Sequence, residues 1–218
     1  MVMVAVAAEI VVVAAVVATN DKQRGFKMKK PILVSSNENK LKEFSRFGLD
    51  LDIEKGRDLK EVMADPLGVI VYKALEAGPD RVVEDTTLII DGTPIVDIKW
   101  RLKELLSLPA DKQPVIQWVV ILGYNTGTEI RAFYGTVMCK LSGLTPESEV
   151  SKDAFGFDPY LCPMDERHSF YELEKLGLKD KFSPRKLAAE AFMANHYGFS
   201  IEADKIKPWT GAYQNENG

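Results

Sequence analysis

Two adjacent carboxylates inside a strand-forming stretch are the first candidates for chemistry in this chain. Glu84 and Asp85 follow the run 81–83, which is rich in valine, and precede a second apolar run, 88–90. The pattern places both acids at the end of a buried strand, where a carboxylate is costly unless a cation or a donor meets it. Lysines elsewhere and an early Ser/Asn loop could hold phosphates. These residue types therefore predict a divalent metal and a polyphosphate substrate.

The early polar loop lies between a predicted strand and a predicted helix. Residues 32–34 form a short apolar run, Ser35, Ser36 and Asn37 follow it, and a helix is predicted over 39–47. This order favours phosphate, because the free N–H groups and the dipole of a helix N-terminus point into the loop. Ser and Asn are equally common as plain helix caps, so the loop alone does not decide between these interpretations.

The rest of the pattern alternates between helices and strands, and this predicts an α/β fold. The length of 218 residues and the apolar fraction of 46% suit one domain, with a core large enough to be stable without disulfides. The two long strands are expected to form a hairpin. Helices are predicted over 66–77 and 98–106 and from Ser183–Pro184 to Gly198, and the hairpin strands over 115–124 and 129–141.

Composition excludes several classes of function. The net charge of −4 gives no general attraction to nucleic acid, so any phosphate site must be local. Cys139 and Cys162 are far apart, which argues against a disulfide framework and structural zinc and suits a reducing, cytoplasmic location. His168 and His196 are too few for a histidine-ligated metal centre.

The two ends of the chain differ from its middle. Residues 1–18 are almost wholly Val and Ala, without the basic start of a signal peptide, and are short for a membrane span. Basic residues follow them, so a membrane anchor is the less favoured alternative to a dispensable extension. We therefore divide the chain into an extension of unknown role (1–28), a catalytic domain (29–207) and a mobile polar tail (208–218).

Five short segments, taken in order, resemble the motifs of one family. The motifs are T/S-x-N-x-x-K-x-x-E, E-D-S/T, I-K-W, F-G-Y/W-D-P and K-x-x-x-S-H-R. Each is short, but together with compatible spacing they are specific, and between residues 31 and 199 the chain resembles the Ham1 family of inosine triphosphate pyrophosphatases. The matching segments are 35–43, 83–86, 98–100, 155–159 and 179–185.

The resemblance implies a fold and a reaction. The fold is an elongated mixed β-sheet flanked by helices, with two lobes and a central nucleotide cleft. The reaction is hydrolysis of deaminated purine nucleoside triphosphates (ITP, dITP, XTP) to the monophosphate and pyrophosphate. Mg²⁺ is the implied cofactor, with Mn²⁺ as an alternative, and the implied assembly is a cytoplasmic homodimer that binds no nucleic acid.

The resemblance also implies a catalytic set. Glu61 and Asp85 match the acids associated with the metal, and Asp85 is the candidate for orienting or deprotonating the attacking water. Lys40 and Glu43 belong to the same set. Either Glu43 or Glu84 could be a further acid, so the identity of the general base stays open.

The residues that match substrate contacts fall into three groups. Those on the phosphate side are Ser35, Ser36, Asn37, Lys40, Lys73, Thr86 and Lys99. Those at the base are Phe155, Gly156, Phe157 and Asp158, and those that close over the nucleotide are Lys179, Ser183 and Arg185. The chemistry agrees, because a triphosphate carries about four charges that Mg²⁺ and lysines must offset, and aromatic faces stack on a purine.

Plainer structural roles are open for several of these residues. Glu61 stands in a charged stretch and could be a solvated surface residue, and Lys40 and Lys73 could be helix-surface lysines. Phe155 and Phe157 could both be core, because residues two apart on a strand share a face.

The sequence departs from the family pattern at the base-reading motif. Pro184 stands where the family has a His, so a side-chain donor is missing. Ser36 occupies a position that is usually Gly. Two rival functions follow: a related nucleotidase with altered base preference, and a nucleotide-binding sensor without turnover. The presence of both Glu61 and Asp85 favours an enzyme.

Overall fold

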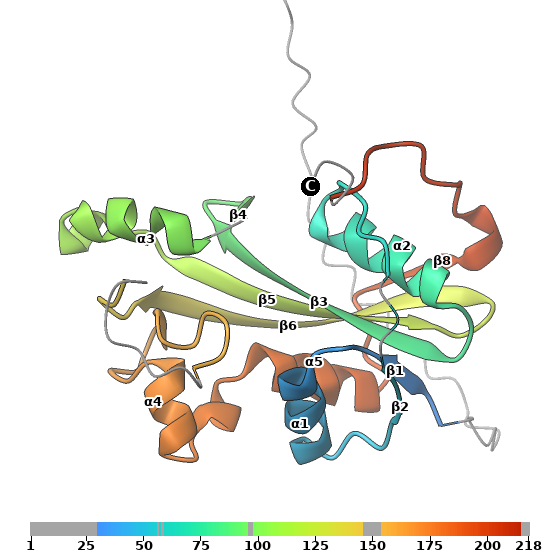
Figure 1. Cartoon of the computed structure of the whole chain (residues 1–218), viewed down its shortest axis with the longest axis horizontal. Coiled ribbons are helices and arrows are strands. Elements are labelled where there is room, and N and C mark those ends of the chain that lie inside the picture. The colour runs from blue at the N-terminus through green and yellow to red at the C-terminus, as the bar shows by residue number, and fades with distance from the viewer. Residues whose placement is uncertain (1–29, 56, 58, 96–97, 146–153, 215–218) are drawn as a thin grey trace, which may run out of the picture.

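The computed structural model describes residues 30–214 apart from 56, 58, 96–97 and 146–153, and gives only the backbone of 98–100. This part of the chain forms an eight-stranded mixed sheet with helices on both faces (Figure 1). The predicted α/β class and the elongated mixed sheet are confirmed. The extension 1–28 lies outside the described residues.

Three long strands form the axis of the sheet. The order is β2-β1-β3-β5-β6-β7, with β4 added to β3 and β8 added to β6. The pairs β1–β2 and β1–β3 are parallel, and the other pairs are antiparallel. The strands are β1 (Ile32–Val34), β2 (Asp52–Glu54), β3 (Arg81–Ile90), β4 (Thr93–Ile95), β5 (Ile116–Asn125), β6 (Glu129–Leu141), β7 (Leu161–Pro163) and β8 (Phe199–Glu202).

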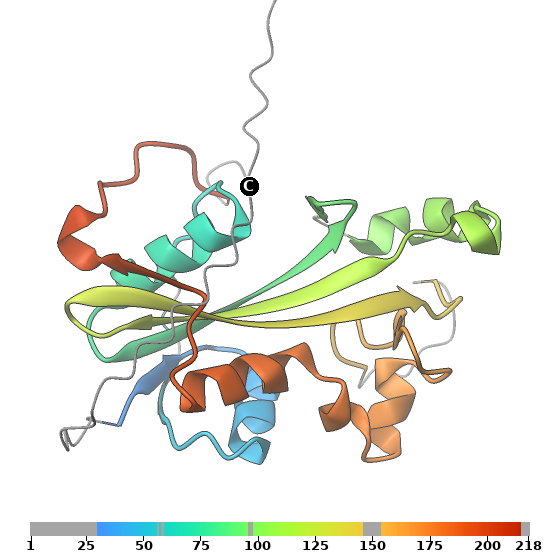
Figure 2. The same ribbon diagram turned by 180° about the vertical axis from the view of Figure 1, so that it is seen from behind.

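The helices divide between the two faces of the sheet. In Figures 1 and 2, α2 covers one face, and α1, α4 and α5 lie on the other. The helices are α1 (Glu38–Arg46), α2 (Pro66–Ala77), α3 (Ile98–Ser107), α4 (Phe170–Lys175) and α5 (Pro184–Met193). Short 3₁₀ turns cover Ala110–Lys112, Lys179–Lys181 and Ala203–Lys205.

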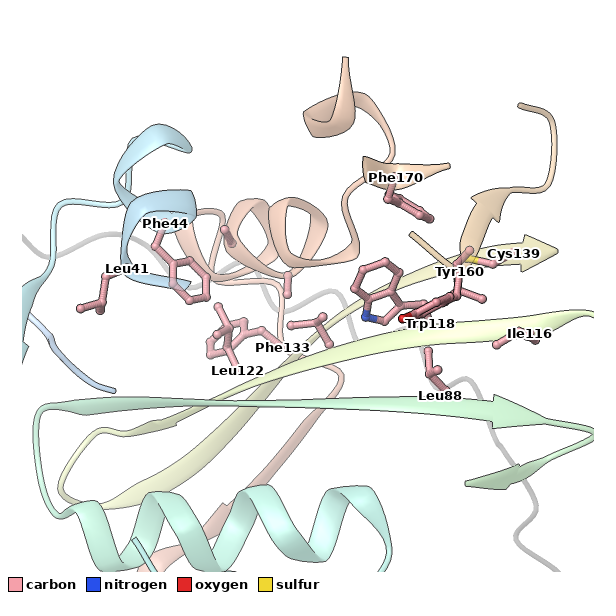
Figure 3. Close-up of a cluster of buried hydrophobic side chains, with 14 of the residues drawn as sticks. Leu41, Phe44, Leu88, Ile116, Trp118, Leu122, Phe133, Cys139, Tyr160 and Phe170 are labelled. Carbon is pink, nitrogen blue, oxygen red and sulfur yellow. The ribbon is translucent and has the colours of Figure 1, made fainter. Parts of the chain in front are cut away.

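Each face of the sheet has its own hydrophobic core. Under α1, α4 and α5, one core extends along the sheet: Phe44 lies near Leu122 and Phe133, and Phe170 lies farther along, beside Trp118 (Figure 3). A second core lies under α2 and contains Ile70, Ala74, Val83, Val119 and Ile121. Successive residues of a strand point to opposite faces of the sheet, so neighbouring side chains on β3 face different cores.

The acidic pair lies in the middle of a strand, which corrects the expected position at a strand end. β3 is continuous because β5 pairs with it along its whole length, Glu84 opposite Leu122 and Asp85 opposite Ile121. On its other edge, β1 pairs with β3 only at Arg81 and Val82. The acids therefore lie just beyond the point where β1 ends and its polar loop begins.

Most predicted elements are present with small shifts at their ends. The helix predicted over 39–47 is Glu38–Arg46, and the strand predicted from 115 begins at Ile116. The last helix ends at Met193 instead of reaching Gly198. Asn195 adopts a left-handed conformation with φ of 53°, and the N–H of His196 donates to the carbonyl of Ala191. That capping turn stops the helix one turn early.

Gly135 allows α5 to lie directly on β6. A Cβ atom at this position would stand 1.9 Å from the carbonyl oxygen of Pro184 and 2.6 Å from the backbone nitrogen of Ala188. No side chain fits between two backbones at this distance. The start of α5, with its N-cap Ser183 and with Arg185, is thus held close to the sheet.

The segment expected to be a mobile tail has contacts up to Gln214. The Tyr213 backbone forms a bridge with Val62, and the ring of Trp209 packs on Tyr72 with the centroids 5.1 Å apart. These contacts differ from the expectation of a polar segment free of the domain. Residues 215–218 lie outside the described part, and their mobility stays a prediction.

Two further expectations concern the chain as a whole. Cys139 and Cys162 are both free and buried, which agrees with the absence of a disulfide framework. In the described residues, every helix is too short or too polar to cross a membrane.

Candidate active site

Hydrogen bonds from backbone N–H groups to side chains shape the polar loop after β1 and cap the N-terminus of α1. The Asn37 side chain accepts hydrogen bonds from the N–H groups of Asn39 (3.0 Å) and Lys40 (3.3 Å), and the Ser35 hydroxyl accepts from the Asn37 N–H (3.2 Å). Ser36 is exposed at the tip of the loop. Asn37 and Ser35 thus have the structural role that the sequence left open, and they fix the N-terminus of α1 beside the acids of β3.

On the α2 face, one lysine joins the two acids that were matched to a metal. The Lys73 ammonium donates a hydrogen bond to Glu61 Oε1 at 2.6 Å and lies 3.6 Å from Asp85 Oδ1. Lys73 comes from α2, Asp85 from β3 and Glu61 from the segment before α2. We call these three residues the Lys73 cluster. The surface-residue interpretation of Glu61 and Lys73 does not fit these contacts, because both are partly buried and point inward.

Burial and charge act on the Lys73 cluster in opposite directions. Burial raises the pKa of Asp85, and the nearby Lys73 ammonium only partly reverses that shift. Burial acts to lower the pKa of Lys73, but the hydrogen bond to Glu61 and the charges of Asp85, Glu61 and Glu84 raise it overall. Asp85 is therefore a better proton acceptor than an exposed aspartate, beside a lysine that stays charged.

The opposite face of β3 holds a larger and more deeply buried set of charges, which we call the buried ion network. Its members are Lys40, Glu43, Glu84, Asp158, Lys179 and Arg185. Three carboxylates and three cations make the set neutral. With the exception of Lys40, each side chain is at most 8% exposed.

Shared partners connect the network from end to end. The Lys179 ammonium donates to Glu43 Oε1 and Asp158 Oδ2, both at 2.6 Å. Arg185 bonds the other oxygen of Glu43 through Nη1 and reaches Glu84 Oε1 at 3.2 Å through Nη2. These contacts tie together α1, β3, α5, the 3₁₀ turn of Lys179 and the loop of Asp158.

Glu84 joins the buried ion network to the helix that follows the polar loop. Lys40 of α1 forms an ion pair with Glu84 Oε2, and the Thr86 hydroxyl donates to Glu84 Oε1 at 2.7 Å. Burial would raise the pKa of Glu84, but the charges of Arg185 and Lys40 outweigh it and bring the pKa to about 2. Glu84 is thus a permanent anion, unsuited to accept a proton during catalysis.

Asp158 is the contrasting member of the network. Burial raises its pKa to about 6, although the Lys179 ammonium acts to lower it. Its Oδ1 atom and the Nε atom of Arg185 are both buried, and neither has a hydrogen-bond partner among the described residues. The network therefore contains one buried acceptor and one buried donor without a described partner.

The two aromatic residues of the base motif have different surroundings. The Phe155 ring lies 5.9 Å from the Lys179 ammonium and 5.7 Å from the Arg185 guanidinium. Phe157 packs edge-on against Trp118 with the centroids 6.2 Å apart, which is the core role. Gly156 between them has φ of 54°. The ring beside the cations, Phe155, is the better candidate for stacking on a base.

Ser183 and Pro184 begin α5 as the sequence predicts. The Ser183 hydroxyl accepts a hydrogen bond from the Lys186 N–H at 3.3 Å, and Pro184 occupies the first turn. Both residues are buried. Ser183 thus orients the turn from which Arg185 enters the buried ion network.

The structure divides the predicted site between the two faces of β3. Glu43, predicted with the catalytic acids, bonds Lys179 and Arg185 instead of joining Glu61 and Asp85. The Lys99 side chain lies outside the described part. Trp118 is the residue that sequence reasoning missed: it contacts Phe157, and its buried indole N–H has no described partner. No motif marks it, because an aromatic residue in a buried strand predicts only core.

The comparison with protein families decides the class. The model of the Ham1 family matches residues 31–195, which is more than half of the chain. The chain belongs to the Ham1 family. No curated protein matches it. Ham1 proteins are hydrolases that act on nucleoside triphosphates. The match ends before β8 and the segment that follows it.

The pKa of Asp158 makes stability depend on pH in a defined direction. The folded-state pKa of about 6 exceeds the ordinary value of 3.8, so the folded chain binds more protons between these limits. The free energy of unfolding should therefore fall as the pH rises from about 4 to about 6, by at most about 3 kcal/mol from this group. Urea unfolding of the wild-type protein and of Asp158→Asn across this range measures the effect. The asparagine variant should show a flatter profile, and parallel profiles would contradict the raised pKa.

Proposed function

We propose that this protein hydrolyses deaminated purine nucleoside triphosphates (ITP, dITP and XTP) to the monophosphate and pyrophosphate in a Mg²⁺-dependent reaction. The observation that carries the proposal is that Glu61 and Asp85 both contact the ammonium of Lys73. Asp85 lies on β3, the strand that adjoins the loop at the start of α1. Membership of the Ham1 family supports the hydrolytic class.

The acids of the Lys73 cluster fit a magnesium ion that is shared with a substrate. Among the described residues, no three His, Cys, Asp or Glu side chains gather to hold a metal alone. Mg²⁺ commonly binds one or two carboxylates and takes its other ligands from phosphates and water. Glu61 and Asp85 would supply those carboxylates, and their two charges exceed the single charge of Lys73. When bound, Mg²⁺ would offset negative charge on the phosphates and the departing pyrophosphate.

Asp85 is the residue we assign to the attacking water. The reaction forms a bond between the water oxygen and the α-phosphorus and breaks the bond to the oxygen that bridges to the β-phosphorus. The water loses a proton, and Asp85, whose pKa is raised in the metal-free site, is the candidate acceptor on this strand, directly or through the metal. Lys73 holds Asp85 and Glu61 in their relative positions and stays protonated throughout.

The triphosphate would lie over the N-terminus of α1. Asn37 and Ser35 shape this loop, and Ser36 stands at its exposed tip. Lys40 belongs to the first turn of α1, and its side chain is 22% exposed although it is paired with Glu84. The ammonium can therefore contact a phosphate without leaving its carboxylate. The helix N-terminus adds backbone N–H groups to the same region.

The base would stack on Phe155, and a side-chain movement that opens the buried ion network would let the base meet two atoms without a described partner. Asp158 Oδ1 can accept one hydrogen bond and Arg185 Nε can donate one. A site that pairs with a substrate in this way rejects an analogue that leaves its polar groups unpaired. Pro184 supplies no donor, and this favours one alternative: a nucleotidase of the same chemistry with a different base preference.

The proposal also covers the location of the enzyme and its assembly. We place it in the cytoplasm as a homodimer that binds a nucleoside triphosphate and no nucleic acid. Two buried free thiols and a net charge of −4 support this setting. Membrane association of residues 1–28 is not part of the proposal.

Pyrophosphate release from a panel of nucleotides tests the proposal directly. ITP, XTP, dITP and the common nucleoside triphosphates are compared with and without Mg²⁺, and we expect preferential, Mg²⁺-dependent cleavage of the deaminated purines. Cleavage of another nucleotide would keep the chemistry and select the alternative. Nucleotide binding without release from any of them would indicate a sensor and would reject the proposal.

Asp85→Asn should abolish turnover and leave the fold intact. The amide keeps the size of the side chain but cannot accept the proton, so kcat should fall by a factor of about 100 or more. Steady-state kinetics and thermal unfolding measure both effects. Asp111→Asn, in an exposed 3₁₀ turn, is the matched control and should behave as wild type. Full activity in Asp85→Asn would remove the assignment.

Pro184→His should sharpen the preference for ITP over ATP. Histidine restores a side-chain donor at the start of α5, beside Ser183 and Arg185. The measurement is the ratio of kcat/KM for the two nucleotides. An unaltered ratio would show that the donor set for the base does not depend on this position.

A further inference from the structure

The C-terminal segment beyond the family match is built onto the segment that carries Glu61. We call residues 207–214 the strap. In Figures 1 and 2 the chain passes from β8 over α2 and reaches the segment before that helix. The family match ends at residue 195, before the strap begins.

Hydrogen bonds hold the strap on both sides of Val62. The Met63 N–H donates to the carbonyl of Ala212 at 2.9 Å, and the Gln214 N–H donates to the carbonyl of Glu61 at 2.8 Å. Val62 and Tyr213 face each other as an antiparallel bridge between them. In addition, the Gln214 side-chain amide donates to the carbonyl of Val62 at 3.3 Å. The backbone at Glu61 is thus fixed by the strap.

The Glu61 segment has little regular structure of its own. Residues 59–64 belong to no helix or strand, and their bridge is the one with the strap. The Lys60 N–H donates to the Glu76 side chain at 3.0 Å, and this bond lies on the other side of Glu61. Without the strap, the residues that follow Glu61 would have to reach Asp65, the N-cap of α2, through a turn alone.

A second set of contacts anchors the strap on α2. The Trp209 ring packs on Tyr72, and the Tyr72 hydroxyl donates to the carbonyl of Lys207 at 2.9 Å. The indole N–H donates to the carbonyl of Ala212 at 3.0 Å, and this carbonyl also accepts from Met63. Tyr72 precedes Lys73, so the strap touches both elements whose side chains form the Glu61–Lys73 bond.

A glycine makes this fold of the strap possible. A Cβ atom at Gly211 would stand 2.5 Å from the indole ring of Trp209. Any larger residue must displace the indole ring or the backbone beside it, and therefore Gly211→Ala disturbs the strap without removing one of its contacts directly.

We propose that the strap positions Glu61 against Lys73 and Asp85 and thereby sets the affinity of this site for its divalent cation. The inference rests on the proposed function, in which Glu61 and Asp85 hold the metal. The strap residues act through Glu61 and touch no reacting atom. Loss of residues that orient a metal ligand weakens metal binding by roughly 10–100-fold in other proteins.

Mn²⁺ binding in the presence of pyrophosphate, followed by electron paramagnetic resonance, tests the inference without turnover. Trp209→Ala and Gly211→Ala in the full chain should each weaken Mn²⁺ binding roughly tenfold. In the Glu61→Gln background the same substitutions should have no further effect, because the strap acts through that carboxylate. Tyr197→Ala is the control, since it removes an aromatic ring that packs under Arg131 and contacts neither the strap nor the Lys73 cluster. It should bind Mn²⁺ as wild type.

The outcomes separate the two proposals. Normal Mn²⁺ binding in both strap variants, or an equal loss with and without Glu61, would overturn the role of the strap and leave the proposed function standing. Absence of Mn²⁺ binding and of pyrophosphate release in the wild-type protein would overturn both.

Hydrogen exchange of the protein without ligand provides a test that is independent of metal and substrate. The amides of Met63 and Gln214 donate across the bridge, so both should be protected, and Trp209→Ala should reduce the protection at both. Rapid exchange at these two amides in the wild-type protein would overturn the proposed role of the strap, even if the protein hydrolyses the nucleotides.

Discussion

The buried pairing of Glu84 with Arg185 and Lys40 is the constraint on which the rest of the site depends. A carboxylate on a central strand is tolerated only when cations meet it, because an unpaired buried charge costs several kcal/mol. The cations come from α1 and α5, so both helices must lie close to β3. Gly135 allows α5 this approach, and the caps of Asn37 and Ser183 start the two helices at the required points. The ion pairs thus determine where the polar loop after β1 and the segment 155–159 lie.

The pleat of β3 then assigns different roles to two neighbouring acids. Glu84 faces the neutral network and has a pKa of about 2, whereas Asp85 faces α2 and has a raised pKa. Their surroundings differ because the first is met by two cations and the second shares one ammonium with Glu61. One dipeptide therefore provides a permanent anion and, in the proposed function, a proton acceptor. The Lys73 cluster carries an excess of negative charge, and the buried ion network is balanced.

Sequence reasoning identified the residue types of the site but could not sort them into these two groups. The α/β class, the hairpin of β5 and β6 and the start of α5 follow from periodicity and caps, which are local signals. The partition of Glu43 from Glu61 depends on which face of the sheet each segment covers, and no local signal contains that information. The segment that contains most of the strap was predicted to be a free tail, because no local signal shows that it contacts the segment of Glu61. Its hydrogen bonds join residues about 150 positions apart in the chain, and polar composition alone predicts exposure.

The two faces also suggest how base preference and hydrolysis can vary separately. In the proposed function, the base contacts are Phe155, Asp158 and Arg185, on the side of the buried ion network. The acids proposed to act on the phosphate depend on α2, and Glu61 depends also on the strap. A change at the start of α5, such as proline in place of histidine, alters the donors offered to the base and leaves the Lys73 cluster in place. The proposed function therefore allows the choice of substrate to differ from that of the family while the reaction stays the same.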